Sequence, residues 1–114
     1  MSIKTYEEYL QSLQSMRPNM YKFDKLIEDV TTNPATKRTV EGHGWTFKAA
    51  FDDRYKDLLT TKSHITGKTI SRYLSIIQSA EDMYANSEMK RLMFHLTGTC
   101  TGGRCAGWTA LNAM

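Results

Sequence analysis

Apolar residues recur at helical spacing along most of the chain, and this period predicts a mainly α-helical fold. The first helix opens with a capping box, in which the Thr5 hydroxyl and the Glu8 carboxylate satisfy each other's backbone N–H groups. Pro18 is expected to end this helix. A second helix is predicted over about residues 35–51, with Pro34 at its first position.

Two glycines interrupt the second predicted helix on either side of His43. Gly42 and Gly44 each cost roughly 1 kcal/mol relative to alanine in a helix interior. The helix is therefore expected either to kink there or to be approached closely by another backbone. Its expected buried side chains are Val40, Trp45, Phe47 and Phe51.

Three further patterns complete the helical prediction. Residues 53–59 indicate a short helix. A longer helix begins at the cap residue Ser79 and ends at Gly98, where a left-handed glycine fits. The apolar pattern resumes over residues 105–114 and reaches the last residue without a stop signal. We therefore expect residues 1–114 to be a single helical domain, the N-terminal fragment of a larger protein cut within this last helix.

Two stretches depart from the helical period. Near residues 20–30, aromatic and polar residues alternate, which predicts a small β-hairpin with its turn at Asp24-Lys25. Residues 60–73 contain mainly hydroxyl and cationic side chains without any helical period. They predict a loop with extended segments that faces a ligand more than the core.

Composition narrows the function classes. The 114 residues are 40% hydrophobic and 24% charged, as in globular domains, and a net charge of +3 is too small to indicate nucleic-acid binding. No apolar run approaches the length of a membrane span, and the polar first residues do not form a signal peptide. We therefore expect a cytoplasmic protein without nucleic-acid or membrane partners, whose thiols stay reduced.

Both cysteines lie in one glycine-rich loop, where Cys100 and Cys105 flank Gly102 and Gly103. On a continuous helix the two thiols would stand about 140° apart, so both face one object only if the glycines break the helix. Thiolates suit zinc or an iron–sulfur cluster, and two of them form half a ligand set. Ordinary buried thiols and a disulfide remain as alternatives.

The other candidate groups are less specific. His43, His64 and His95 are candidate acid–base groups or ligands, although a hydrogen-bonded surface histidine is the commoner role. The cysteine loop imitates a phosphate-binding loop, but a helix precedes it and Cys105 replaces the hydroxyl residue. A patch for an anionic ligand, or alternatively a solvated basic face, is predicted from Lys62, Lys68, Arg72, Lys90 and Arg91.

Several motifs together resemble a known family. They are Tyr6-Glu7-Glu8-Tyr9-Leu10-Gln11-Ser12-Leu13, Thr60-Thr61-Lys62-Ser63-His64, Gly67-Lys68-Thr69-Ile70-Ser71-Arg72, Gln78-Ser79-Ala80-Glu81-Asp82, Lys90-Arg91-Leu92, the cysteine loop and Ala110-Leu111-Asn112-Ala113. This series is similar, over essentially the whole chain, to the N-terminal part of the 4-hydroxybutyryl-CoA dehydratase family. The two-component 4-hydroxyphenylacetate 3-monooxygenases are relatives of this dehydratase family and have a similar fold.

The resemblance implies a helical N-terminal domain of an acyl-CoA-dehydrogenase-like fold, in a homotetramer that carries FAD and a [4Fe-4S] cluster. Three Cys and one His hold this cluster in the family. The implied reaction is dehydration of 4-hydroxybutyryl-CoA to crotonyl-CoA through radicals, with isomerisation of vinylacetyl-CoA. Flavin supplies the redox chemistry for removing an unactivated hydrogen, and the cluster iron can act as a Lewis acid.

The resemblance also assigns residues. Cys100 and Cys105 match the two N-terminal cluster ligands, although four residues separate them here and three in the family. The other ligands and most of the contacts to FAD and CoA would lie outside this chain. We therefore expect the chain alone to bind no cofactor, to be inactive and to form homo-oligomers. The residues expected to line the channel for the CoA thioester substrate are Lys62, Lys68, Arg72 and Arg91.

Two alternatives remain beside the dehydratase. The chain could be a stand-alone metal-binding or interaction module, for which one tetrahedral zinc per chain would be diagnostic. It could also be the N-terminal part of a flavin-dependent 4-hydroxyphenylacetate 3-monooxygenase-type enzyme, which needs no cluster.

Overall fold

The computed structural model describes residues 3–16 and 19–98, and the prediction of a mainly helical fold is confirmed for this part of the chain. The elements are α1 (Tyr6–Met16), β1 (Met20–Lys22), β2 (Lys25–Ile27), α2 (Lys37–Phe51), α3 (Lys56–Leu59), β3 (Thr60–Lys62), β4 (Thr69–Ser71), the 3-10 helix η1 (Arg72–Leu74) and α4 (Ala80–Thr97). The cysteine loop and the helix predicted over residues 105–114 lie outside the described residues.

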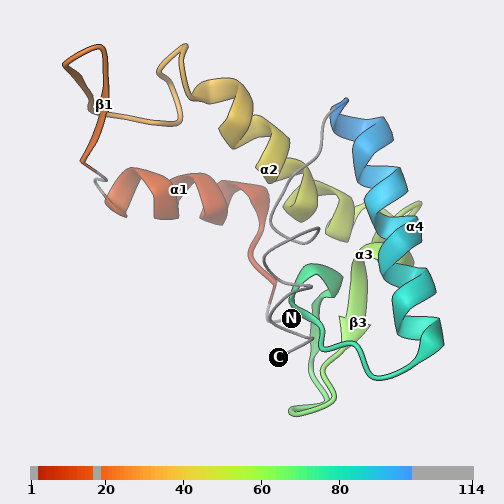
Figure 1. The fold of residues 1–114 in the computed structure, drawn as a ribbon. Coiled ribbons are helices and arrows are strands. Elements are labelled where there is room, and N and C mark those ends of the chain that lie inside the picture. Colours follow the sequence, from red (N-terminus) through yellow and green to blue (C-terminus); the bar gives the residue numbers. More distant parts are fainter. Residues whose placement is uncertain (1–2, 17–18, 99–114) are drawn as a thin grey trace.

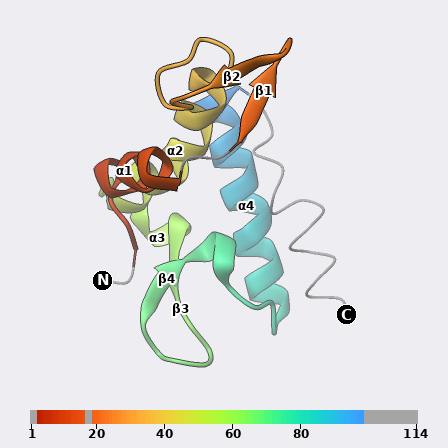
Figure 2. The ribbon, with the colours of Figure 1, turned by 90° about the vertical axis from the view of Figure 1, so that its left-hand side faces the viewer.

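Helix α2 forms the centre of the molecule and contacts both α1 and α4 (Figure 1). The β1–β2 and β3–β4 hairpins lie at opposite ends of the fold, as Figure 2 shows from a second direction. Among the described residues, no helix combines the length and apolar character that crossing a bilayer requires.

Buried apolar side chains form two clusters, one near each end of α2. The cluster beside the β1–β2 hairpin consists of Ile27, Val30 and Val40, with Tyr9, Leu10 and Leu13 packed against it. The cluster between α2, α3 and α4 consists of Ala49, Ala50, Leu59, Met89 and Met93. Each hairpin therefore lies next to a different part of the core.

The capping box predicted at the start of α1 is confirmed. The backbone N–H of Thr5 donates to Glu8 Oε2 at 2.8 Å, and the backbone N–H of Glu8 donates to Thr5 Oγ1 at 3.2 Å. The helix ends at Met16, while Pro18 lies outside the described residues.

The β-hairpin predicted near residues 20–30 is also confirmed, but the predicted turn is wrong by one residue. Lys25 belongs to β2 and pairs with Lys22, so the two-residue turn is Phe23-Asp24. Both turn residues have positive φ, 49° and 60°, which gives the twist that a tight hairpin needs. Phe is an unusual residue for this conformation, and the position of the turn was therefore not predicted correctly.

Helix α2 begins at Lys37, later than predicted, because a turn around Asn33 comes first. The Asn33 side-chain oxygen accepts the N–H of Ala35 at 2.9 Å, and its carbonyl accepts the N–H of Lys37 at 2.8 Å. Pro34 therefore lies in this turn and is not the first helical residue. The prediction that Phe51 is buried is wrong as well, since it is 43% exposed.

A close approach does occur at Gly44, although it involves a side chain and not a backbone. A Cβ added at Gly44 would collide with the ring of Tyr6, whereas a Cβ at Gly42 would meet no atom within 4 Å. Gly44 therefore allows α1 to lie against α2.

The third and fourth helices differ in how well their starts were predicted. Helix α4 starts after Ser79, whose hydroxyl accepts the N–H of Asp82 at 3.2 Å, and ends at Gly98 with φ 70°. Both caps are as predicted. Helix α3 is shorter than the predicted 53–59, because Asp52 Oδ1 accepts the N–H of Arg54 at 2.9 Å and stabilises a turn there.

Candidate functional site

The β3–β4 hairpin carries two of the cations that the sequence singles out. Lys62 is the last residue of β3 and Lys68 directly precedes β4, and both are exposed. The loop between them is closed by the N–H of Ser63 donating to the Lys68 carbonyl at 2.9 Å. Gly67 has φ 69°, a conformation that favours glycine. The hairpin is thus a defined turn that presents two ammonium groups.

Arg72 lies at the base of this hairpin, and its guanidinium is used for backbone contacts. Nε donates to the Leu58 carbonyl at 2.6 Å, and Nη2 donates to the carbonyls of Thr60 at 3.0 Å and Asp57 at 3.3 Å. These carbonyls include the end of α3, where helical carbonyls lack intrahelical partners. Burial lowers the pKa of Arg72. Arg72 therefore joins α3 to the hairpin beneath the two lysines.

His64 connects the loop of the hairpin to the start of α4. Its Nε2 lies 3.4 Å from Asp82 Oδ2, and the two side chains are 38% and 22% exposed. The same carboxylate oxygen accepts the backbone N–H of Gln78 at 2.9 Å. The Gln78 N–H, and to a smaller extent His64, hold the pKa of Asp82 below its usual value. Asp82 is thus a fixed carboxylate to which the loop is attached.

The other candidate residues lie elsewhere. Arg91 is exposed on α4, nine residues and so roughly 14 Å along the helix from Asp82. His43 is exposed on α2, where its Nδ1 lies 3.0 Å from the Thr39 carbonyl, and His95 is exposed in the last turn of α4. The structure therefore brings Lys62, Lys68, Arg72 and His64 to one hairpin and leaves Arg91, His43 and His95 apart from it.

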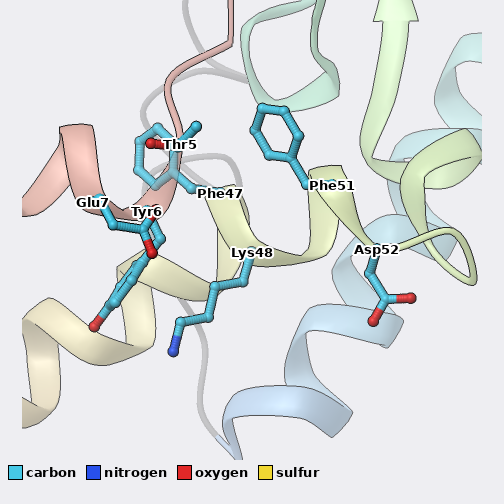
Figure 3. A pocket seen from close by; sticks show the side chains of 7 residues that line it. All are labelled: Thr5, Tyr6, Glu7, Phe47, Lys48, Phe51 and Asp52. Carbon is cyan, nitrogen blue, oxygen red and sulfur yellow. The ribbon is translucent and has the colours of Figure 1, made fainter.

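A hollow of about 340 Å³ lies where the start of α1 meets the end of α2 (Figure 3). The aromatic rings of Tyr6, Phe47 and Phe51 line it, together with Lys48 and acidic side chains. The Lys48 ammonium lies 4.1 Å from the centre of the Tyr6 ring, which is a cation–π contact. This hollow is not predictable from the sequence, because the residues that line it come from two segments about 40 residues apart in the chain.

The predicted metal ligands cannot be placed, since Cys100 and Cys105 lie outside the described residues. In the parts of the chain that the structure describes, no three His, Cys, Asp or Glu side chains converge on a common point where a metal ion could bind. Cys100 and Cys105 remain the predicted ligands, and two thiolates would supply half of a four-ligand cluster site.

The contact between His64 and Asp82 is not predicted from the sequence. There, Asp82 belongs to the motif Gln78-Ser79-Ala80-Glu81-Asp82, and His64 is one of three candidate histidines. Eighteen positions separate them, and no sequence period links a loop residue to a helix start at that distance. Only the fold of the β3–β4 hairpin against α4 shows that they meet.

Comparison with known proteins defines the class to which this fold belongs. Residues 5–114 match the family described as 4-hydroxyphenylacetate 3-hydroxylase N terminal, and the chain belongs to that family. Within this class, it is 35% identical over 112 residues to the 4-hydroxybutyryl-CoA dehydratase/vinylacetyl-CoA-Δ-isomerase of Clostridium aminobutyricum. The alignment covers 98% of this chain and 23% of that protein.

Solved structures agree with this relationship. An oxygen-tolerant archaeal 4-hydroxybutyryl-CoA dehydratase from N. maritimus superposes with a TM-score of 0.87 and 30% identity, over 98% of this chain and 22% of its own. The oxygenase component HpaB of 4-hydroxyphenylacetate 3-monooxygenase, in complex with FAD, superposes with a TM-score of 0.69 and 26% identity, over 79% of this chain and 19% of its own. The resemblance to the dehydratase family is thereby confirmed, and the chain spans about a fifth of the length of these relatives.

Proposed function

We propose that the chain forms the helical N-terminal part of a 4-hydroxybutyryl-CoA dehydratase with an acyl-CoA-dehydrogenase-like fold. The whole enzyme converts 4-hydroxybutyryl-CoA to crotonyl-CoA and isomerises vinylacetyl-CoA, and the 114-residue chain alone is inactive. One observation carries this proposal: a dehydratase structure matches 98% of the chain with a TM-score of 0.87. The monooxygenase component matches 79% of it with 0.69.

The cofactors of the proposed enzyme are FAD and a [4Fe-4S] cluster. Cys100 and Cys105 would bind the cluster through their thiolates, and residues outside this chain would complete the ligand set. When bound, flavin supplies one-electron chemistry and the cluster iron supplies a Lewis acid. The residues that bind flavin are proposed to lie mostly in the rest of the enzyme. FAD is bound by the related HpaB component.

The exposed lysines of the β3–β4 hairpin are the proposed contribution of the described chain to substrate binding. Lys62 and Lys68 present ammonium groups that can pair with the phosphates of a CoA thioester. Arg91 on α4 is a further candidate for the same channel, farther along the molecule. Arg72 supports this wall from beneath, since its guanidinium binds backbone carbonyls.

We propose that the whole enzyme is a cytoplasmic homo-oligomer, and the exposed apolar side chains support the presence of an interface. Monomeric proteins rarely expose contiguous apolar patches, and such patches mark interfaces. The exposed large apolar residues at the end of α1 and in the β1–β2 hairpin are Met16, Met20, Tyr21, Phe23 and Leu26. We expect them to be covered in the whole enzyme, either by its own remaining domains or by another subunit.

A chimera tests the proposed function. Residues 5–114 replace the matching segment of the Clostridium aminobutyricum dehydratase, and the protein is purified without oxygen. We expect crotonyl-CoA formation from 4-hydroxybutyryl-CoA, together with bound iron and sulfide. In the matched variants Cys100→Ser and Cys105→Ser, iron, sulfide and activity should all be lost. A folded chimera without activity would contradict the proposal.

The complete enzyme and the isolated chain distinguish the alternatives. If the complete enzyme keeps full activity and flavin content after Cys100→Ser and Cys105→Ser, and hydroxylates 4-hydroxyphenylacetate in the presence of reduced FAD and oxygen, this would favour the monooxygenase branch. One tetrahedral zinc bound by the 114-residue chain alone, purified under reducing conditions, would favour a stand-alone metal-binding module.

A further inference from the structure

The β3–β4 hairpin is attached to the rest of the fold at two separate points. At its base, Arg72 binds the carbonyls of Leu58 and Thr60. In its loop, the contact between His64 and Asp82 joins the hairpin to α4. The strands between these points are only three residues long each, and a hairpin of that size is marginal without support. Backbone hydrogen bonds between Ser63 and Lys68 and between Gly67 and Ser63 close the loop on itself, and the His64 contact joins this closed loop to α4.

Asp82 is suited to hold the loop because it is itself fixed. Its carboxylate accepts the Gln78 N–H, and its own N–H donates to the Ser79 hydroxyl. Both contacts belong to the start of α4, whose buried residues Met89 and Met93 are part of the core. The carboxylate therefore occupies a position set by the core and not by the loop.

The contact does not require a charged imidazole. At 3.4 Å the contact is longer than an ordinary N–H···O hydrogen bond, and Nε2 carries a proton in the imidazolium and in the Nε2-protonated neutral tautomer. An uncharged side chain with an N–H donor, such as glutamine, can therefore make the same contact. An alanine at this position cannot, which gives a matched pair of substitutions.

We propose that His64 and Asp82 are a positioning pair that fixes the loop of residues 63–68 on α4 and thereby orients Lys62 and Lys68 toward an anionic acyl-CoA. Lys62 directly precedes this loop and Lys68 is its last residue. Neither His64 nor Asp82 contacts the substrate in this proposal. It rests on the proposed function for the identity of the anion, whereas the fixation of the loop is independent of it.

The first test measures the loop itself, in the 114-residue chain. His64→Ala should raise the hydrogen-exchange rates of the Ile65, Thr66 and Lys68 amides about threefold to tenfold, as expected for the loss of one polar contact between the loop and α4. His64→Gln should leave these rates near those of the unsubstituted chain. Unchanged rates in His64→Ala, or equally raised rates in His64→Gln, would overturn the proposal.

The second test measures substrate binding in the active chimera. His64→Ala should raise KM for 4-hydroxybutyryl-CoA about threefold to tenfold and leave kcat within about twofold, because uniform binding is lost. His64→Gln should restore KM, and the control His43→Ala, an exposed histidine on α2, should leave it unchanged. A loss of kcat at constant KM would overturn the positioning role. An inactive unsubstituted chimera would instead contradict the proposed function, and hydrogen exchange would still decide the loop.

Discussion

The two hairpins of the described chain have strands of equal length but very different support. In β1–β2, five of the six strand residues are exposed and Ile27 alone is buried. In β3–β4, five of the six are half-buried and Lys62 alone is exposed. The first hairpin closes with a two-residue turn, whereas residues 63–68 form a longer loop in the second.

The two hairpins also differ in the kind of contact that holds them to the rest of the fold. The β1–β2 hairpin is held mainly by one apolar side chain, Ile27, which packs in the cluster with Val30 and Val40. The β3–β4 hairpin is held by directed polar contacts, from Arg72 at its base and His64 in its loop. Apolar burial gives stability without direction, while hydrogen bonds fix orientation. The second hairpin is therefore the better scaffold for groups that must point at a ligand.

Removing the Arg72 guanidinium should have the largest effect. Arg72→Ala leaves the carbonyls of Leu58 and Thr60 without their donors in a partly buried site, and we expect a loss of about 3 kcal/mol in the free energy of unfolding. Urea denaturation of the 114-residue chain at constant concentration measures it. The control Arg54→Ala removes an exposed ion pair with Asp52 and should leave the free energy of unfolding nearly unchanged. Equal losses of stability in Arg72→Ala and Arg54→Ala would show that Arg72 supports the β3–β4 hairpin no better than an exposed ion pair does.

Truncating Ile27 should have the next largest effect. Its side chain is 4% exposed, and Ile27→Ala should cost about 2 to 3 kcal/mol through lost burial and a residual cavity. The neighbouring Leu26 is 47% exposed, and Leu26→Ala should change stability by less than about 0.5 kcal/mol. The same denaturation measurement applies. A similar loss in both variants would show that the exposed side of the hairpin is covered in solution.

Contacts within a few residues could be read from the sequence. The capping box of Thr5 and Glu8 and the Ser79 cap were predicted because each joins positions three residues apart. Gly98 was predicted as a helix end because a left-handed residue is needed there. The three-residue strands were harder, and the Phe23-Asp24 turn was missed because neither residue has the usual preference for positive φ.

Contacts between distant positions could not be read from the sequence. The sequence predicted one cationic patch from Lys62, Lys68, Arg72, Lys90 and Arg91. Only the fold shows that Arg72 binds backbone carbonyls and that the two lysines of the hairpin are exposed. The partner of His64 was equally hidden. A single sequence records which groups are available, whereas their division into supporting and exposed groups depends on the packing of α3 and α4.

Acid should weaken the attachment of the second hairpin through Asp82. Because the pKa of Asp82 is lowered in the fold, the stability it provides is present above the ordinary carboxyl pKa and is lost as the pH falls through the lowered pKa. Asp82→Asn should therefore cost about 1 kcal/mol at neutral pH and little in strong acid. Urea denaturation from neutral to acid pH should show the stabilities of the Asp82→Asn variant and the unsubstituted chain converging as the pH falls. Asp53→Asn, at a side chain that is 95% exposed, is the control and should show no such convergence.

The smallest effect is expected at the turn of the first hairpin, and it has the opposite sign. Phe23 has φ 49° and is 86% exposed, so its backbone is strained while its ring makes little use of the core. Phe23→Asn should raise the free energy of unfolding by about 0.5 to 1 kcal/mol, because asparagine tolerates this conformation. Phe23→Ala removes the ring but keeps the strain, and should leave stability nearly unchanged. If Phe23→Ala is clearly destabilising, the Phe23 ring is buried in solution and the first hairpin forms an interface. Sedimentation of both variants would then show a change in oligomeric state.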